Sequence, residues 1–292
     1  MLSNGVYTAN LTPLKADYSI DFELLVEHCQ YLLDHGSTGL AILGTTGEAN
    51  SFSLKERKEI LERTIQGGIP ASKLMVGTGC CSLPETIELT QHAINLGVGG
   101  ILMLPPFYYK SVDDSGLIKY LDEVIARVGS DDLRIYLYHF PKMSGISFSV
   151  DIVRKLKEKY PQVIVGMKDS TGDLENTKKY IDAFPDMQIF PGTEALLLDG
   201  LQAGGAGCIS ATCNVFSPFA GRVYEKHVAG ENVEELQKQL TEKRMVFQGL
   251  PFSGALKSYL ARVNDDHRWK TVRPPNEEMS QDLIDTLIEK LT

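Results

Sequence analysis

The chain has 292 residues, 43% of them hydrophobic and 23% charged, which is typical of a globular protein with one large core. Its formal net charge of -9 disfavours a nucleic-acid partner, because a phosphate backbone is bound by a surplus of clustered Lys and Arg. No apolar run reaches the roughly 18 to 20 residues of a membrane span, and the N-terminal segment lacks a basic region followed by an apolar stretch, so we expect a cytoplasmic protein with no membrane partner.

Eight short apolar runs alternate with helical segments along most of the chain. The runs begin near Val6, Leu40, Leu74, Ile101, Ile135, Val163, Gln188 and Cys208. Amphipathic stretches follow them, for example over residues 21–35 and 54–66. Such alternation indicates parallel strands joined by crossover helices, and eight units fit an α/β fold of the (β/α)8 TIM-barrel type. A doubly wound open sheet shares this alternation and is the alternative.

The pattern changes beyond about residue 230, where the strand-like runs end. Three helical segments follow, over residues 231–248, 252–263 and 277–291. We therefore predict a barrel over residues 1–230 and a helical C-terminal extension over residues 231–292. Because no low-complexity linker separates them, we expect the extension to pack on the barrel and not to fold independently.

Cysteine and histidine spacing predicts a metal-free protein. The five cysteines include no Cys-x-x-Cys pair, and the six histidines include no His-Glu-x-x-His motif. We expect reduced thiols and no catalytic metal.

The active site of a (β/α)8 barrel lies at the carboxyl ends of its strands, so polar residues that close an apolar run become candidates. The segments that meet this condition are Gly44–Glu48, Tyr136–Pro141, Val165–Gly172, Gly192–Glu194 and Gly207–Ser210. Gly47, Gly192 and Ser210 are accordingly candidate substrate-binding residues.

Lys168 is the most informative candidate, because it follows the apolar run Val163-Ile-Val-Gly-Met, which should be buried in the barrel wall. A buried lysine loses part of its preference for the charged form, and the neutral amine is the nucleophile that forms an imine with a ketone. The alternative is a strand-end lysine that reaches solvent or pairs with Asp169 or Glu48.

Two neighbouring segments offer complementary groups. Tyr138 stands one strand earlier at the same level, where its phenol could relay protons, although a structural tyrosine is equally common there. Thr45 and Thr46 lie between glycines and can offer two hydroxyls and successive backbone N–H groups to one carboxylate. An ordinary turn would have the same sequence.

Taken together, these segments resemble the dihydrodipicolinate synthase and N-acetylneuraminate lyase family of pyruvate-dependent class I aldolases. The resemblance covers nearly the whole chain. The motifs that carry it are Leu11–Pro13, Gly44–Glu48, Gly77–Gly79, Pro106–Tyr108, Tyr138–Pro141, Gly166–Gly172 and Gly207–Ser210.

The resemblance implies a role for several residues. Lys168 would form the Schiff base with pyruvate, so that no cofactor is needed, and Tyr138 would relay protons. Thr45 and Thr46 would bind the pyruvate carboxylate, and Thr45 would also link Tyr138 to Tyr108. The backbone near Ile209 would line the pyruvate pocket. Because the tyrosine that matches Tyr108 reaches into a neighbouring subunit in this family, the resemblance also implies a homo-oligomer, either a dimer or a tetramer.

The sequence departs from the synthases of this family at the second-substrate site. Those enzymes resemble Tyr-Asn-x-Pro-x-Arg-Thr-Gly after the fifth strand, whereas Met143 replaces the arginine here, next to Lys142. Their Asn-Pro-x-Pro-x-Lys run is replaced by Leu250-Pro-Phe-Ser-Gly-Ala-Leu-Lys257. His139 and Glu194 look more like the sialic-acid and 2-keto-3-deoxy sugar acid aldolases, in which polar side chains hydrogen-bond a hydroxylated tail. As an alternative, both are solvated or supporting groups.

We therefore expect a lyase that cleaves or forms a 2-keto-3-deoxy sugar acid, with pyruvate and an aldehyde as its small-molecule partners. The alternatives are 4-hydroxy-tetrahydrodipicolinate synthase, an imine-dependent dehydratase, a non-catalytic ligand-binding barrel and a metal-dependent class II aldolase.

Overall fold

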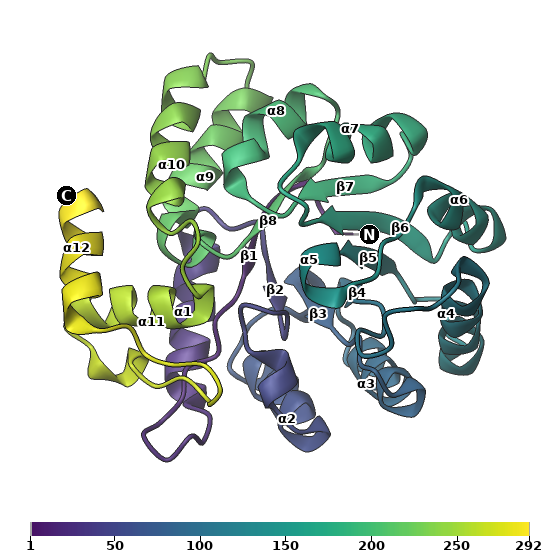
Figure 1. Ribbon diagram of the computed structural model, residues 1–292, viewed down its shortest axis with the longest axis horizontal. Helices are drawn as coiled ribbons and strands as arrows, with labels where there is room; N and C mark the ends of the chain where they lie inside the picture. The colour runs from purple at the N-terminus through teal and green to yellow at the C-terminus, as the bar shows by residue number, and fades with distance from the viewer. Residues whose placement is uncertain (1, 292) are drawn as a thin grey trace.

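Eight parallel strands surround the centre of the molecule in the computed structural model, which describes residues 2–291 (Figure 1). Each strand begins within one residue of the predicted position. Their bounds are β1 Gly5–Ala9, β2 Gly39–Ile42, β3 Leu74–Gly77, β4 Gly100–Met103, β5 Ile135–His139, β6 Ile164–Asp169, β7 Gln188–Pro191 and β8 Gly207–Ser210.

The strands close into a barrel and do not form an open sheet. Neighbouring strands pair in the order β7-β6-β5-β4-β3-β2-β1-β8, which joins the last strand to the first. The backbone N–H of Ala206, just before β8, donates to the carbonyl of Ile189 in β7 at 2.9 Å. This hydrogen bond connects β7 and β8, the two strands at the ends of the order. The predicted (β/α)8 barrel is thus confirmed, and the doubly wound alternative is wrong.

Helices form a ring around the barrel (Figure 1). They are α1 Phe22–Asp34, α2 Leu54–Gln66, α3 Leu83–Asn95, α4 Asp114–Val128, α6 Val150–Lys159, α7 Leu174–Ala183, α8 Leu197–Gln202 and α9 Cys213–Val228, with the short α5 Pro141–Ser144 after β5. Local sequence sets where they begin. Ser53 and Glu56 form a reciprocal capping box at α2, and Ser149 caps α6 through the backbone N–H of Ile152.

Side chains that alternate along the strands fill the barrel interior. Tyr136 of β5 is one of the largest of these, and its hydroxyl accepts a hydrogen bond from the backbone N–H of Leu2 at 3.3 Å. Glycines on both neighbouring strands make room for its ring, because a Cβ at Gly100 or Gly166 would lie 2.6 or 2.4 Å from ring carbons. Tyr136 thereby closes the amino-terminal end of the barrel, and Tyr138, two residues later, points inward at the carboxyl end.

The C-terminal extension consists of α10 Glu234–Val246, α11 Phe252–Val263 and α12 Gln281–Leu291. Barrel residues such as Val6 and Leu24 share one apolar cluster with Leu240 and Leu256 of the extension. This shared core supports the expectation that the extension does not fold alone, which stays a prediction. No helix between residues 2 and 291 is long and apolar enough to cross a membrane.

Candidate active site

Lys168 points into the carboxyl end of the barrel from β6. Met167 packs outward against the helices, whereas Gly166 faces the ring of Tyr136 in the barrel interior, so the strand period places Lys168, two residues after Gly166, inside. Only 5% of its surface is exposed. Its Nζ donates to the Tyr138 hydroxyl at 3.5 Å and lies 4.5 Å from the centre of the Tyr138 ring. The parallel register that pairs Tyr138 with Lys168 creates this contact.

Both carboxylates proposed as alternative partners of Lys168 bind elsewhere. Asp169 is the next residue on β6 and therefore points outward, where its oxygens accept from Thr177 Oγ1 at 2.7 Å and Asn176 Nδ2 at 3.1 Å. Glu48 binds Lys257 at 2.6 Å. The amine of Lys168 is thus left to face Tyr138 inside the barrel.

Thr45, in the segment after β2, adds a hydroxyl to the polar contact between Lys168 and Tyr138. Its Oγ1 lies 3.4 Å from the hydroxyl of Tyr138, so that Lys168, Tyr138 and Thr45 form one polar chain across β6, β5 and the segment after β2. Both distances are at the long end of the range for hydrogen bonds.

The segment from Leu43 to Glu48, here called the β2 loop, contains Thr45 and has an unusual backbone conformation at both of its ends. Leu43 and Glu48 have φ values of 56° and 57°, in the left-handed region that non-glycine residues rarely adopt. Each such residue costs about 1 kcal/mol or more, so surrounding contacts must hold the loop. One is the backbone N–H of Glu48, which donates to the carbonyl of Thr45 at 3.1 Å.

Thr46 and Gly47 are fixed in the same loop. Thr46 is buried, and its carbonyl accepts from Ser253 Oγ of α11 at 2.9 Å. Gly47 packs so closely on the end of β1 that a Cβ there would lie 2.8 Å from the carbonyl oxygen of Asn10. Its own carbonyl accepts from Thr12 Oγ1 at 2.9 Å. The β2 loop is therefore held on both sides, by the barrel and by the C-terminal extension.

His139 points away from this group. It follows Tyr138 on β5, so it lies on the outer face of the barrel, where its Nδ1 accepts the backbone N–H of Phe148 at 3.1 Å. Burial lowers the pKa of His139, with the nearby Asp169 charge opposing that effect. A neutral ring that accepts at Nδ1 carries its proton on Nε2. The expected contact with a substrate tail does not fit this position.

Glu194 is also directed outward, by a short 3-10 turn after β7. Its buried carboxylate accepts from the hydroxyls of Ser210 and Thr212, and it lies 3.7 Å from Nε of Arg244 on α10. Ser210 is thus turned outward as well, because Ile209 occupies the inward position on β8. Neither the Glu194 nor the Ser210 side chain fits the expected role of a substrate contact.

The remaining candidates lie at the barrel end or on its rim. Ile209 shares the interior cluster with Tyr138, and Gly192 donates its backbone N–H to the carbonyl of Asp169 at 2.6 Å. Tyr108 and Met143 are 74% and 56% exposed. In this single chain the structure brings together Lys168, Tyr138 and Thr45, but it does not bring Tyr108 to them.

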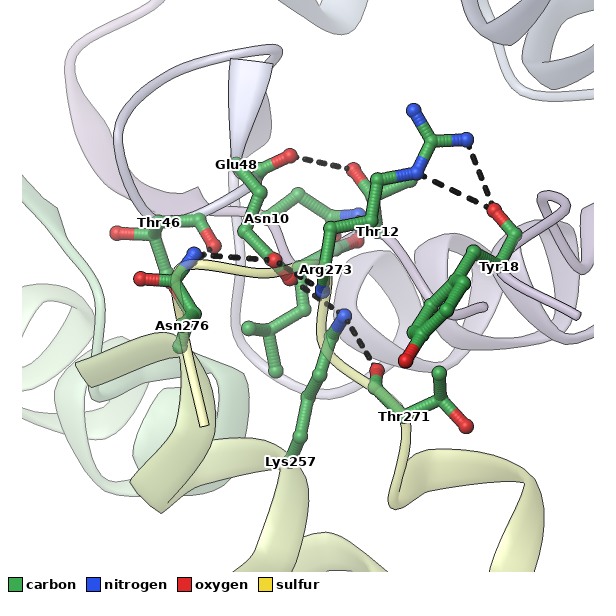
Figure 2. A network of polar contacts seen from close by, with 12 residues as sticks. Asn10, Thr12, Tyr18, Thr46, Glu48, Lys257, Thr271, Arg273 and Asn276 are labelled. Carbon is green, nitrogen blue, oxygen red and sulfur yellow. Dashed lines mark hydrogen bonds and ion pairs between the residues drawn. The ribbon is translucent and has the colours of Figure 1, made fainter. Parts of the chain in front are cut away.

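A buried ion pair that the sequence did not predict lies behind the β2 loop (Figure 2). Nζ of Lys257 lies 2.6 Å from Oε1 of Glu48, and the two side chains are 0% and 1% exposed. Burial lowers the pKa of Lys257, and the Glu48 carboxylate opposes that effect. A lysine within an apolar helical run signals a buried partner, but nothing in the sequence indicates which acid it is.

Between residues 2 and 291, no group of three or more His, Cys, Asp or Glu side chains is arranged to hold a metal ion. The side chains that meet at the carboxyl end of the barrel offer an amine, a phenol and a hydroxyl. A barrel with these groups at the carboxyl ends of its strands is the arrangement expected of an aldolase-type lyase. The dihydrodipicolinate synthetase family matches residues 2–292, and the chain belongs to that family.

Known proteins agree with this membership. An uncharacterized DapA-like lyase of Chloroflexus aurantiacus is 35% identical over 262 residues, 89% of this chain and 87% of the relative. The 4-hydroxy-tetrahydrodipicolinate synthase of Rhizobium meliloti is 32% identical over 236 residues, 80% of this chain and 79% of the relative.

A solved structure extends the similarity to the whole fold. YagE, a prophage protein of the dihydrodipicolinic acid synthase family from E. coli in complex with pyruvate, has a TM-score of 0.90 and 26% identity over 100% of this chain and 98% of YagE. The resemblance drawn from the sequence motifs is thereby confirmed.

Proposed function

We propose that this chain is a class I aldolase in which Lys168 forms a Schiff base with pyruvate or a related 2-oxo acid. The observation that carries the proposal is the buried Lys168 amine, 3.5 Å from the Tyr138 hydroxyl, with Asp169 and Glu48 both bound to other groups. Such an amine is placed to attack a ketone carbonyl, and neither Asp169 nor Glu48 competes for it. The pyruvate complex of YagE supports the choice of 2-oxo acid.

In the cleavage direction, Lys168 Nζ adds to C2 of the 2-oxo acid, and loss of water gives the imine. The protonated imine accepts the electron pair of the C3–C4 bond while the C4 hydroxyl loses its proton, which releases the aldehyde and leaves an enamine. Tyr138 is the group placed to take that proton, with Thr45 Oγ1 3.4 Å away to orient the phenol. Protonation at C3 and hydrolysis then release pyruvate and restore Lys168. This chemistry needs no cofactor.

The substrate carboxylate is held by Thr45 and Thr46 in the proposed complex. Hydroxyl and backbone N–H groups bind a carboxylate without a fixed positive charge close to Lys168. Gly47, Gly192 and the backbone of Ile209 complete this end of the pocket. The exposed side chain of Tyr108 is suited to reach a second copy of the chain, so we also propose a homo-oligomer.

For the aldehyde partner we propose a hydroxylated, sugar-derived chain, so that the full substrate is a 2-keto-3-deoxy sugar acid. The support is Met143, which places an uncharged side chain where a synthase of this family would carry an arginine. Without that guanidinium a second carboxylate has no bidentate partner at this position. The positions of His139 and Glu194 give this choice no further support.

A second candidate is 4-hydroxy-tetrahydrodipicolinate synthase, which is favoured by the name of the relative from Rhizobium meliloti. Purified protein should be assayed with pyruvate plus aspartate semialdehyde and, separately, with 2-keto-3-deoxy sugar acids. Our proposal expects the larger kcat/KM for cleavage of a sugar acid. A larger kcat/KM with aspartate semialdehyde would instead establish the synthase. Release of water without pyruvate would indicate a dehydratase.

A further inference from the structure

Residues of the C-terminal extension hold the β2 loop in place. Figure 2 shows the carboxylate of Glu48 enclosed by residues of the extension. Its Oε1 accepts from Nζ of Lys257 on α11 at 2.6 Å. Its Oε2 accepts from the backbone N–H of Arg273 at 3.1 Å and from Nδ2 of Asn276 at 3.3 Å. One buried side chain of the loop thus receives three donors from a single distant segment.

The donors are themselves fixed. Lys257 also donates to the carbonyl of Thr271 at 3.0 Å, so helix α11 and the segment 271–276 are joined at the ion pair. The guanidinium of Arg273 donates to the carbonyl of Ser51 at 2.7 Å and pairs with Glu56 at the start of α2. These contacts anchor the segment to the barrel on the far side of Glu48.

A short path leads from this ion pair to the reacting groups. Glu48 has φ of 57°, and its backbone N–H donates to the carbonyl of Thr45 at 3.1 Å. Thr45 Oγ1 in turn lies 3.4 Å from the hydroxyl of Tyr138. Release of the carboxylate would remove the contacts that offset the left-handed conformation of Glu48, and the loop would relax away from Tyr138.

We propose that Glu48 and Lys257 are positioning residues, which hold Thr45 within reach of Tyr138 and keep Thr46 placed to bind the substrate carboxylate. The C-terminal extension thereby controls the activity of a site to which it contributes no reacting group. This inference rests on the proposed function, because it assigns the β2 loop to the binding of a 2-oxo acid.

The test compares K257M, E48Q and N276A with the wild-type protein and with R262M. Arg262 is a matched control, because it is an exposed cation on the same helix, and its Nε forms only a long ion pair with Oδ1 of Asp285, at 3.9 Å. Asn276 is exposed, so N276A removes one contact to Glu48 without opening the core. Each protein is incubated with increasing pyruvate and cyanoborohydride, and the rate of covalent trapping on Lys168 is followed by mass spectrometry.

For K257M and E48Q we expect the half-saturating pyruvate concentration to rise and the limiting trapping rate to fall, each by about 10- to 100-fold. N276A should change in the same direction by about two- to fivefold. R262M should stay within about twofold of the wild type, as expected of an exposed pair. K257R, which keeps the charge, should recover part of the loss. A purely structural role would lower the melting temperature and leave both trapping parameters of the folded protein unchanged.

Trapping parameters equal to those of the wild type, within experimental error, in folded K257M and N276A would overturn the positioning role. If K257M and E48Q do not fold, N276A alone decides between the two outcomes. A wild-type protein that traps no pyruvate would refute the proposed function and the positioning role together, which distinguishes that failure from a failure of the positioning role alone.

Discussion

Replacing Lys257 by methionine removes the cation that balances Glu48 inside the protein. The two side chains are 0% and 1% exposed, so the remaining carboxylate has no access to water. Breaking one partner of such a pair costs about 3–5 kcal/mol of unfolding free energy, because an uncompensated charge stays buried. E48Q leaves the ammonium alone and should cost a similar amount. The double variant E48Q/K257M buries no charge and should be more stable than either single variant.

A double-mutant cycle measures this coupling through urea unfolding at pH 7. We expect the free-energy cost of the double variant to fall below the sum of the single costs by at least about 2 kcal/mol. The exposed pair Lys178–Glu175, at 3.1 Å within α7, is the control and should couple by less than about 1 kcal/mol. Additive costs for Glu48 and Lys257 would refute the argument that the pair is desolvated and acts as a unit.

Three further predictions follow from the described contacts. Y138F removes the phenol that contacts Lys168 and Thr45, so it should lower kcat for aldol cleavage by about 10²- to 10⁴-fold, and equal kcat values would rule out a proton-transfer role. Burial lowers the pKa of His28 from 6.5 to about 4, so the unfolded chain binds more protons as the pH falls through that window. As the pH falls from 6.5 to about 4, the free energy of unfolding should therefore decrease by up to about 3 kcal/mol. Urea unfolding of H28Q should lack that decrease. M143R introduces a guanidinium at the rim, which can form a bidentate contact with a second carboxylate, so it should raise kcat/KM for aspartate semialdehyde by about 10- to 100-fold. An unchanged kcat/KM would show that Met143 does not determine the choice of substrate.

The barrel was predictable because its strands are short apolar runs, several of which end in polar residues, and helices with recognisable caps separate these runs. Lys168 was predictable for the same reason, since a lysine that closes a buried run demands an explanation. The barrel also fixes which side chains meet, because adjacent parallel strands bring Tyr138 and Lys168 to the same level.

The strand period alone is enough to correct the expectation that His139 contacts the substrate tail. Tyr138 and His139 are consecutive on one strand, so they cannot both point into the barrel. Glu194 could not be placed in this way, because a turn after β7 sets its direction and its partners come from β8 and α10. The ion pair between Glu48 and Lys257 joins residues 209 positions apart, and only the packing of the extension on the barrel brings them together.

The most direct test of the central claim is reductive trapping of the wild-type protein with pyruvate, followed by peptide mapping, with K168A as the control. We expect a pyruvate-derived adduct on the peptide that contains Lys168 and none in K168A. An unmodified Lys168 peptide, or an adduct on another lysine that persists in K168A, would contradict the proposed Schiff-base chemistry.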